Sequence, residues 1–391
     1  MNDHDGCIIL NMLNGIGGSR ANALIEFCGS VSAIFDSDAA SLSRIRGISS
    51  ELAERILRWR EHIEFDRELE IAKNGGVTIL CRTDDEYPES LRELRDAPLC
   101  IYMRGVLPAE MAIRSISIVG TRNASNYGAR MARHLSEAAA YGGWTTVSGL
   151  AIGIDTIVHQ ATVDAGGKTV AVLGGGLAKL HPVENLDLAR AIIRTGGAVI
   201  SEFPMTTVPT RHTFPMRNRI IAGLTCGTLV VEAGVNSGSL ITAAQALEQG
   251  RHVFAVPGEA DNPSAAGCNT LIKQGARLVM NFDDILDEFD FLPGFRPTPL
   301  RESPVNPFAA QENGQDNSTP EKPEDSEDPD DAMFSGDETA IMNIVAKGPA
   351  NVDMISEATG IPPSTVISTM ISLEILHRVR KNPDGTYSKK R

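Results

Sequence analysis

Residues 115–150 read SISIVGTRNASNYGARMARHLSEAAAYGGWTTVSGL and contain the repeating unit of the fold. A short apolar strand ends at a glycine, an amphipathic helix follows, and a second apolar strand ends at another glycine. Strands that are joined by a helix in this way pair in parallel through right-handed crossovers. The stretch therefore predicts a parallel sheet that is covered by helices.

The same alternation continues to about Phe289. The predicted strands are Ile116–Val119, Thr145–Val147, Thr169–Leu173, Ala198–Ser201, Thr228–Val231 and His252–Val256. Before them lie the apolar runs Val77–Leu80 and Leu99–Met103, which we expect to add strands to the same sheet. The expected fold class is α/β, with a Rossmann-like, doubly wound, mostly parallel sheet.

The chain differs in character on either side of this sheet. Residues 1–64 show a helical pattern with two Gly-containing turns, which resembles a helix-hairpin-helix (SAM-like) domain. Amides of such turns could face a DNA phosphate, or the turns could simply close a small helical bundle. We expect the sheet domain to span residues 65–291, an acidic disordered linker to span 292–332, and a winged helix to span 333–391.

The end of the expected winged helix is basic, with Arg378, Arg380 and Lys381 beside an Asp384-Gly385 hairpin turn. These residues could contact the phosphates of duplex DNA. Winged helices also serve as protein-docking modules, so both interpretations stay open.

Composition restricts the function classes. The formal charge is −14, from 36 Lys and Arg against 50 Asp and Glu, which disfavours a protein coated with DNA over its whole surface. A local basic groove is compatible with that charge, because screening acts over about 10 Å. The six cysteines are scattered singly without metal-ligand spacing, so we expect no metal, no cofactor and no disulfide framework. The polar start and the lack of a long apolar stretch predict a cytoplasmic protein without membrane contact.

Small residues follow several of the predicted strands. They are Gly120-Thr121-Arg122, Ser148-Gly149, Gly174–Gly176 and Ser237-Gly238-Ser239. Ligands of open parallel sheets bind at the carboxyl ends of the strands, where glycine backbone and hydroxyl groups can approach a phosphate. The sequence therefore predicts an anion site at this edge.

The segment that follows the strand at Ala198–Ser201 concentrates positive charge. It carries Arg211, Phe214, Arg217, Asn218 and Arg219. Arginines that track a backbone and an aromatic ring that stacks a base are typical of single-stranded nucleic acid sites. Alternatively, Phe214 fills the core and the arginines pair with acids such as Glu202 and Glu232. We expect one of Arg217 and Arg219 to be structural.

Enzyme classes find weaker support. The strand end at Gly120 lacks the G-x-G-x-x-G pattern of a dehydrogenase, and no P-loop is present. A nucleotide-processing N-glycosidase of the lysine-decarboxylase-like Rossmann class remains the alternative, with Glu232 near the position of its glutamate. Asp155 is expected to cap a helix, while His159 and His181 have no nucleophile at recognisable spacing. No catalytic residue is predicted.

Several motifs occur in a fixed order along the chain: Tyr87-Pro88, Ile118–Arg122, Ser148–Asp155, Phe214–Leu224, Val231–Ala233, Gly238–Ala243 and Ala255–Gly258. This ordered set resembles the DNA-processing protein A (DprA/Smf) family. The resemblance implies a homodimer that protects single-stranded DNA during natural transformation and hands it to the RecA recombinase, without catalysis.

The resemblance also implies a set of DNA-binding residues. A pocket of Arg122, Arg211 and Phe214 would be surrounded by Gly120, Thr121, Ser148, Gly149, Asn218 and Gly238, to which we add Arg217, Arg219 and Ser239. Arg211 stands where some relatives have lysine.

Overall fold

The computed structural model describes two compact units separately, residues 1–309 and residues 310–391. Its described residues are 1–289, 341–342, 344–346, 348, 350–359, 361, 366, 369–370, 373, 379–382 and 386–389. The acidic segment expected at 292–332 lies outside the described residues.

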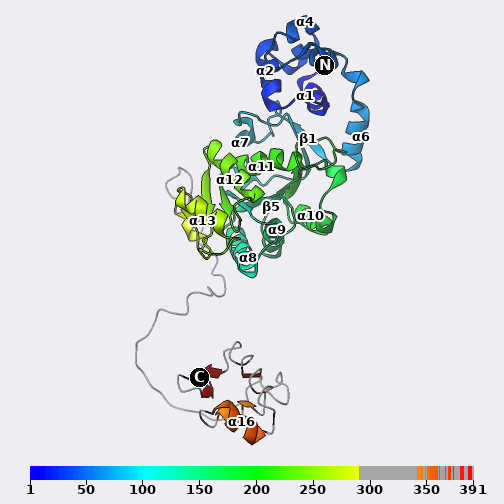
Figure 1. Cartoon of the computed structure of the whole chain (residues 1–391). Helices are drawn as coiled ribbons and strands as arrows, with labels where there is room; N and C mark the ends of the chain where they lie inside the picture. The colour runs from blue at the N-terminus through cyan, green and yellow to red at the C-terminus, as the bar shows by residue number, and fades with distance from the viewer. Residues whose placement is uncertain are drawn as a thin grey trace. The chain divides into compact units, whose positions relative to one another are not determined.

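The first unit begins with short helices (Figure 1). They are α1 (Asp3–Met12), α2 (Gly18–Cys28), α3 (Val31–Phe35), α4 (Ala39–Leu42), α5 (Ser50–Leu57), the 3-10 turn η1 (Trp59–Glu61) and α6 (Phe65–Asn74). Gly15 and Gly47 take positive φ values of 93° and 89° in the two predicted turns, a conformation that glycine adopts without strain. The side chain of Ser49 accepts a hydrogen bond from Leu52 N–H and so caps α5.

A nine-stranded sheet forms the centre of this unit, in the order β1-β2-β6-β5-β4-β3-β7-β8-β9. Its strands are β1 (Thr78–Cys81), β2 (Cys100–Gly105), β3 (Ser115–Val119), β4 (Thr145–Ser148), β5 (Thr169–Val172), β6 (Ala198–Ser201), β7 (Gly227–Val230), β8 (His252–Ala255) and β9 (Arg277–Leu278). Strands β3 to β9 pair in parallel, whereas β2 pairs antiparallel with both β1 and β6. The expectation of a doubly wound, mostly parallel sheet is confirmed.

Helices cover both faces of the sheet (Figure 1). One face packs against α7 (Glu89–Arg92), α11 (Thr213–Gly223), α12 (Gly238–Glu248) and α13 (Ala266–Lys273). The other packs against α8 (Asn126–Tyr141), α9 (Ile154–Asp164), α10 (Leu186–Arg194) and α14 (Asp283–Leu286). The 3-10 turns η2 (Ala109–Ala112), η3 (Leu177–Lys179) and η4 (Val183–Asn185) lie in the connections.

A separate apolar cluster joins the N-terminal helices to the sheet. It contains Ile8 of α1 and Leu24 of α2 together with Cys81 of β1 and Tyr102 of β2, all with no exposed surface. The helical segment is therefore packed onto β1 and β2 rather than tethered to them.

The second unit contains α16 (Val352–Thr359) and an antiparallel hairpin of β10 (Val379–Lys381) and β11 (Tyr387–Lys389). Ile355 and Leu373 are buried in its core together with Val379 and Tyr387 of the hairpin. This is the helix-and-hairpin arrangement expected of a winged helix. Of the basic residues noted there, Arg378 lies outside the described residues and Arg380 is exposed.

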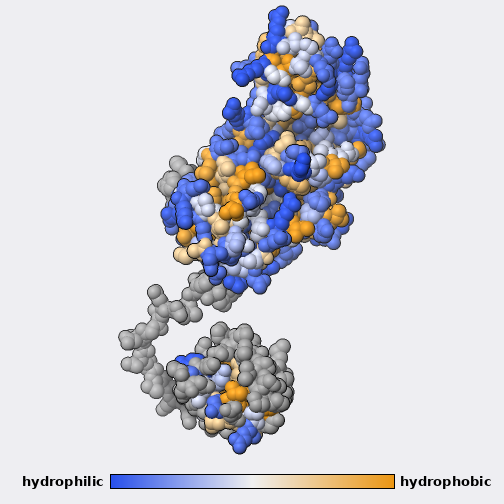
Figure 2. All heavy atoms as spheres, viewed as in Figure 1, coloured by the Kyte–Doolittle hydropathy of each residue, from blue (hydrophilic) through white to orange (hydrophobic). Residues whose placement is uncertain are grey.

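None of the described helices combines the length and the apolar composition needed to cross a bilayer. On the face of the molecule in Figure 2, hydrophobic residues form separate patches among hydrophilic ones.

Candidate nucleic-acid interface

A pocket of about 430 Å³ lies at the carboxyl ends of the strands, where the sheet order reverses between β3 and β7. We call it the edge pocket. From β3 the chain adds β4, β5 and β6 on one side, and then β7, β8 and β9 on the other. Loops diverge at such a switch point and leave a crevice for a ligand. Eight of the twelve predicted DNA-binding residues line the edge pocket: Gly120, Arg122, Arg211, Phe214, Arg217, Asn218, Gly238 and Ser239.

Two exposed arginines give the edge pocket its free positive charge. Arg122 follows β3, and Arg211 precedes α11. Neither forms an ion pair with any residue in the described part of the chain. Among the described residues that line it, the only acid is Asp155, which is buried. Both guanidinium groups are therefore available to an anionic ligand.

Phe214 lies beside this charge. The sequence had suggested a loop, but the structure places Phe214 in the first turn of α11. Proline is tolerated there, so Pro215 does not interrupt the helix. The ring is half-buried, and the Arg122 Cζ atom lies 5.3 Å from its centroid. Phe214 is thus neither a fully buried core residue nor a free side chain.

Arg217 forms part of the floor of the edge pocket. It is 5 % exposed, and its Nη1 donates to the carbonyl oxygens of Gly149, at 2.6 Å, and Val172. These carbonyls lie at the ends of β4 and β5, so Arg217 joins two strand ends. Burial lowers the pKa of this guanidinium to about 10. Its main role is structural.

Asp155 is the anionic neighbour of Arg217. Burial raises the pKa of the Asp155 carboxyl, and the nearby Arg217 guanidinium opposes that rise. The carboxylate accepts hydrogen bonds from the backbone N–H groups of Gly149, at 3.1 Å, and Ala151, at 3.4 Å. The predicted N-cap role is wrong, because Gly153 occupies the N-cap of α9. Asp155 instead fixes the turn that precedes the helix.

The start of α12 forms the opposite wall. Gly238 is exposed, and a Cβ atom added to it would meet no heavy atom within 4 Å from the described residues beyond its own stretch of helix. Ser237 caps the helix through its hydroxyl, which also lies 2.8 Å from the hydroxyl of Ser239. The Asn218 side chain donates to the Gly238 carbonyl at 3.4 Å. The N-terminus of a helix of 11 residues therefore faces the same space as the two arginines.

Three predicted residues do not line the edge pocket because their polar groups serve the fold. The Ser148 hydroxyl is fully buried and donates to the Ile118 carbonyl at 2.7 Å. The Thr121 N–H donates to the Glu232 carbonyl at 2.8 Å. A Cβ atom on Gly149 would lie 2.4 Å from Arg217 Nη1, so glycine is needed there to admit a buried arginine.

The Gly174–Gly176 run has a similar explanation. Added Cβ atoms would lie 2.8 Å from the Phe214 Cδ1 atom at Gly174 and 2.6 Å from the Pro209 Cγ atom at Gly175. At Gly176 the clash would be with the Met205 carbonyl oxygen, at 2.2 Å. These glycines let the segment before α11 approach the sheet closely. From sequence, they had instead been explained by the approach of a phosphate.

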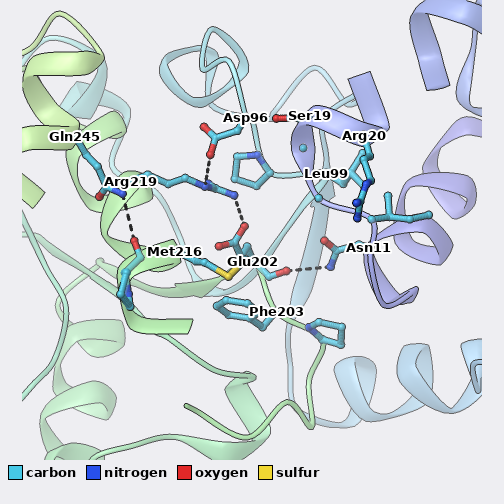
Figure 3. Close-up of a pocket in the computed structure, with 16 residues that line it drawn as sticks. Asn11, Ser19, Arg20, Asp96, Leu99, Glu202, Phe203, Met216, Arg219 and Gln245 are labelled. Atoms are coloured by element: carbon cyan, nitrogen blue, oxygen red, sulfur yellow. Dashed lines mark hydrogen bonds and ion pairs between the residues drawn. The ribbon is translucent and has the colours of Figure 1, made fainter. Parts of the chain in front are cut away.

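Arg219 is the fourth predicted residue outside the edge pocket. It points into a different pocket, between the start of α2 and the end of β6, where Figure 3 shows it between Asp96 and Glu202. Its Nη2 atom pairs with Glu202, and its Nε atom lies 3.0 Å from an Asp96 oxygen. The alternative in which an arginine pairs with Glu202 therefore holds for Arg219. Arg217 and Arg219 are both buried and bonded to protein groups, whereas only one of them had been expected to serve the fold.

Glu232 is not among the residues that line the edge pocket. It is 3 % exposed, and its Oε2 accepts the Ser125 N–H at the start of α8 at 2.8 Å. It lines a separate hollow with Tyr127 and Arg130. A carboxylate at a helix N-terminus is favourable for the fold.

Three of the singly spaced cysteines converge in space. The Cys81 and Cys100 sulfur atoms are 3.6 Å apart on paired strands, and Cys81 is also a hydrogen-bond neighbour of Cys7. The hydrogen bond with Cys100 and burial raise the pKa of the Cys81 thiol, and the hydrogen bond with Cys7 opposes that rise. His4, Cys81 and Asp84 offer possible ligand atoms within 4.8 Å of one another, although His4 and Asp84 already bond each other at 3.0 Å. Sequence spacing alone gave no sign of this grouping.

The fold and the edge pocket define a Rossmann-like α/β protein that carries a helix-hairpin-helix segment and a winged helix. Family models match all three parts: DNA recombination-mediator protein A over residues 78–290, a SAM-like helix-hairpin-helix tandem over 8–58, and the DprA winged helix domain over 319–385. The chain belongs to the DNA recombination-mediator protein A (DprA/Smf) family.

Individual relatives agree with that assignment. Protein Smf of Escherichia coli is 39% identical over 299 residues, which cover 76% of this chain and 74% of the relative. DNA processing protein DprA of Bacillus subtilis is 42% identical over 222 residues, which cover 57% of this chain and 74% of the relative. The crystal structure of DNA processing protein A from Streptococcus pneumoniae matches with a TM-score of 0.62 and 32% identity, and covers 74% of this chain and 99% of that one.

Proposed function

We propose that this chain binds single-stranded DNA in the edge pocket and catalyses no reaction. The observation that carries the proposal is the pair of exposed arginines, Arg122 and Arg211, which line the same pocket as Phe214 in a chain of net charge −14. Arginine contacts to phosphates together with aromatic stacking hold a single strand without reading its sequence. Membership in the DprA family and the DNA-processing relatives support the same assignment.

The proposal includes the cellular role that the family resemblance implies. The protein would act in the cytoplasm as a homodimer, protect incoming single strands during natural transformation, and assist their transfer to the RecA recombinase. We place DNA binding in the domain at residues 65–291. In this proposal a helical domain at 1–64 precedes it, and the segment 292–332 and a winged helix at 333–391 follow it.

A titration of labelled single- and double-stranded oligonucleotides at several salt concentrations tests the proposal. Arg122→Ala and Arg211→Ala should each weaken single-strand binding and make the log–log salt dependence shallower by roughly 0.7 per lost phosphate contact. Arg133→Ala is a matched control, because Arg133 is an exposed arginine in the middle of α8. Equal binding by the wild type and the three variants would refute the assignment of the edge pocket.

A second assay addresses the hydrolase alternative. The protein is incubated with nucleoside monophosphates, and free base is measured. Base release that disappears in Glu232→Ala would favour the enzyme. No release is expected, because Glu232 is committed to the start of α8.

A further inference from the structure

A second pocket adjoins the edge pocket. It measures about 350 Å³ and is lined by Lys179, His181, Val208, Arg211 and Phe214, among others. We call it the side pocket. Arg211 and Phe214 line both pockets, so these two residues form the wall between them.

The side pocket has the charge that a polyanion needs. Its lining includes Lys179, His181 and Arg211, and no acidic residue from the described part of the chain contributes to it. Lys179 and His181 are exposed, and neither forms an ion pair with a residue among those described. In an acidic protein, such a surface attracts a phosphate only locally.

The side pocket also offers apolar and aromatic surface. Val208 lines it and is 64 % exposed. The His181 and Phe214 rings have centroids 6.5 Å apart and planes inclined by 50°. Successive stacked bases are spaced by about 3.4 Å, so a base between two rings needs roughly 6.8 Å. The separation of the two rings is close to that value, and the exposed His181 ring can turn toward a parallel arrangement.

We infer that a single strand bound in the edge pocket continues past Phe214 into the side pocket, where one nucleobase stacks between His181 and Phe214. Lys179 and Arg211 then contact the flanking phosphates. The inference rests on the proposed function, and it extends the binding site to a segment near η3 and η4 that the sequence had not indicated. Stacking between rings accepts any base, so no sequence preference arises from this pocket.

Substitutions at His181 test the stacking. His181→Ala should lower the affinity for an oligothymidylate by roughly 5- to 150-fold, the range for one stacked base. His181→Phe keeps an aromatic ring and should bind within a few-fold of the wild type. Both changes are at an exposed residue, and matching urea unfolding curves verify that the full-length variants are folded.

Substitutions at Lys179 test the phosphate contact. Lys179→Ala should make the salt dependence shallower by roughly 0.7, as for one phosphate. Lys168→Ala is the matched control, because Lys168 is exposed and lies 3.4 Å from Glu110. That control should behave as the wild type.

The outcomes separate the two proposals. If His181→Ala and Lys179→Ala bind normally while Arg122→Ala is weakened, the strand does not enter the side pocket and the edge pocket assignment survives. If the wild type binds no single-stranded DNA, both proposals fail. If His181→Phe is as weak as His181→Ala, stacking is not the contact that His181 makes and the inference is overturned.

Discussion

Removing the Arg219 guanidinium should destabilise the first unit without affecting DNA binding by the folded protein. In the structure this side chain and Glu202 are each 8 % exposed and pair directly, and burial raises the pKa of the Glu202 carboxyl. Arg219→Ala would leave the Glu202 carboxylate buried without its counter-ion, which typically costs about 3–5 kcal/mol. The second partner, Asp96, has a side chain that is 48% exposed, and its pairing adds at most about 1 kcal/mol.

Urea unfolding followed by tryptophan fluorescence measures this cost directly. The chain has two tryptophans, Trp59 and Trp144, and both are buried in the first unit. Arg211→Ala serves as the comparison, because a change at an exposed arginine normally alters the free energy of unfolding by less than about 0.5 kcal/mol. Combining Arg219→Met with Glu202→Gln should recover most of the loss, because no buried charge remains.

The pH dependence provides an independent check. Without Arg219 nothing opposes the effect of burial, so the pKa of Glu202 in the folded state rises further above its unfolded value. Glu202 of the folded variant then takes up a proton as the pH falls. The difference in the free energy of unfolding between the wild type and the variant should therefore shrink between pH 7 and pH 5. A variant that unfolds at the wild-type urea concentration but fails to bind DNA would refute this reasoning, since Arg219 would then be a ligand contact.

Other substitutions give results of different kinds. Phe214→Ala should weaken single-strand binding by about 1–3 kcal/mol without changing the salt slope; early unfolding with normal binding would instead make Phe214 a core residue. Gly149→Ala should lower the free energy of unfolding by about 1–3 kcal/mol, because the new Cβ displaces Arg217, and an unchanged urea midpoint would contradict this. Burial lowers the pKa of His159 in the folded state to about 3, from 6.5. Between these two pH values the unfolded state binds more protons than the folded state. The free energy of unfolding of the wild type should therefore fall as the pH drops below about 6.5. His159→Asn should remove up to about 1.4 kcal/mol per pH unit of that slope, measured by urea unfolding at each pH.

The fold was largely predictable because its signals are local. Each predicted parallel strand agrees with an observed one to within a residue or two, since short apolar runs between glycines leave little choice of boundary. The antiparallel pairing of β2 with β6 was not predicted, because these strands are separated by almost a hundred residues and apolar runs do not encode their partners.

The site was less predictable, and α11 shows why. From sequence, Arg217 and Arg219 were expected to lie in a loop and one of them to be structural, whereas the structure places both in α11. Both are buried because α11 is enclosed on two sides, by the sheet and by the segment around Asp96. The run Ile220–Leu224, which is apolar all round, was the available signal for an enclosed helix. The roles of Gly149 and Gly174–Gly176 could not be predicted either. In sequence, a glycine that makes room for a neighbouring group of the protein cannot be told from one that makes room for a phosphate.

The apolar cluster shared by the N-terminal helices and the first two strands limits how the chain can be cut. A fragment that begins at Phe65 would retain β1, an edge strand of the sheet, while losing the helices that cover Cys81 and Tyr102. Exposed apolar edge strands pair with other copies, so such a fragment should aggregate in sedimentation experiments. The piece of this protein that stays monodisperse should therefore begin at α1, with the helical segment acting as a lid on the edge of the sheet.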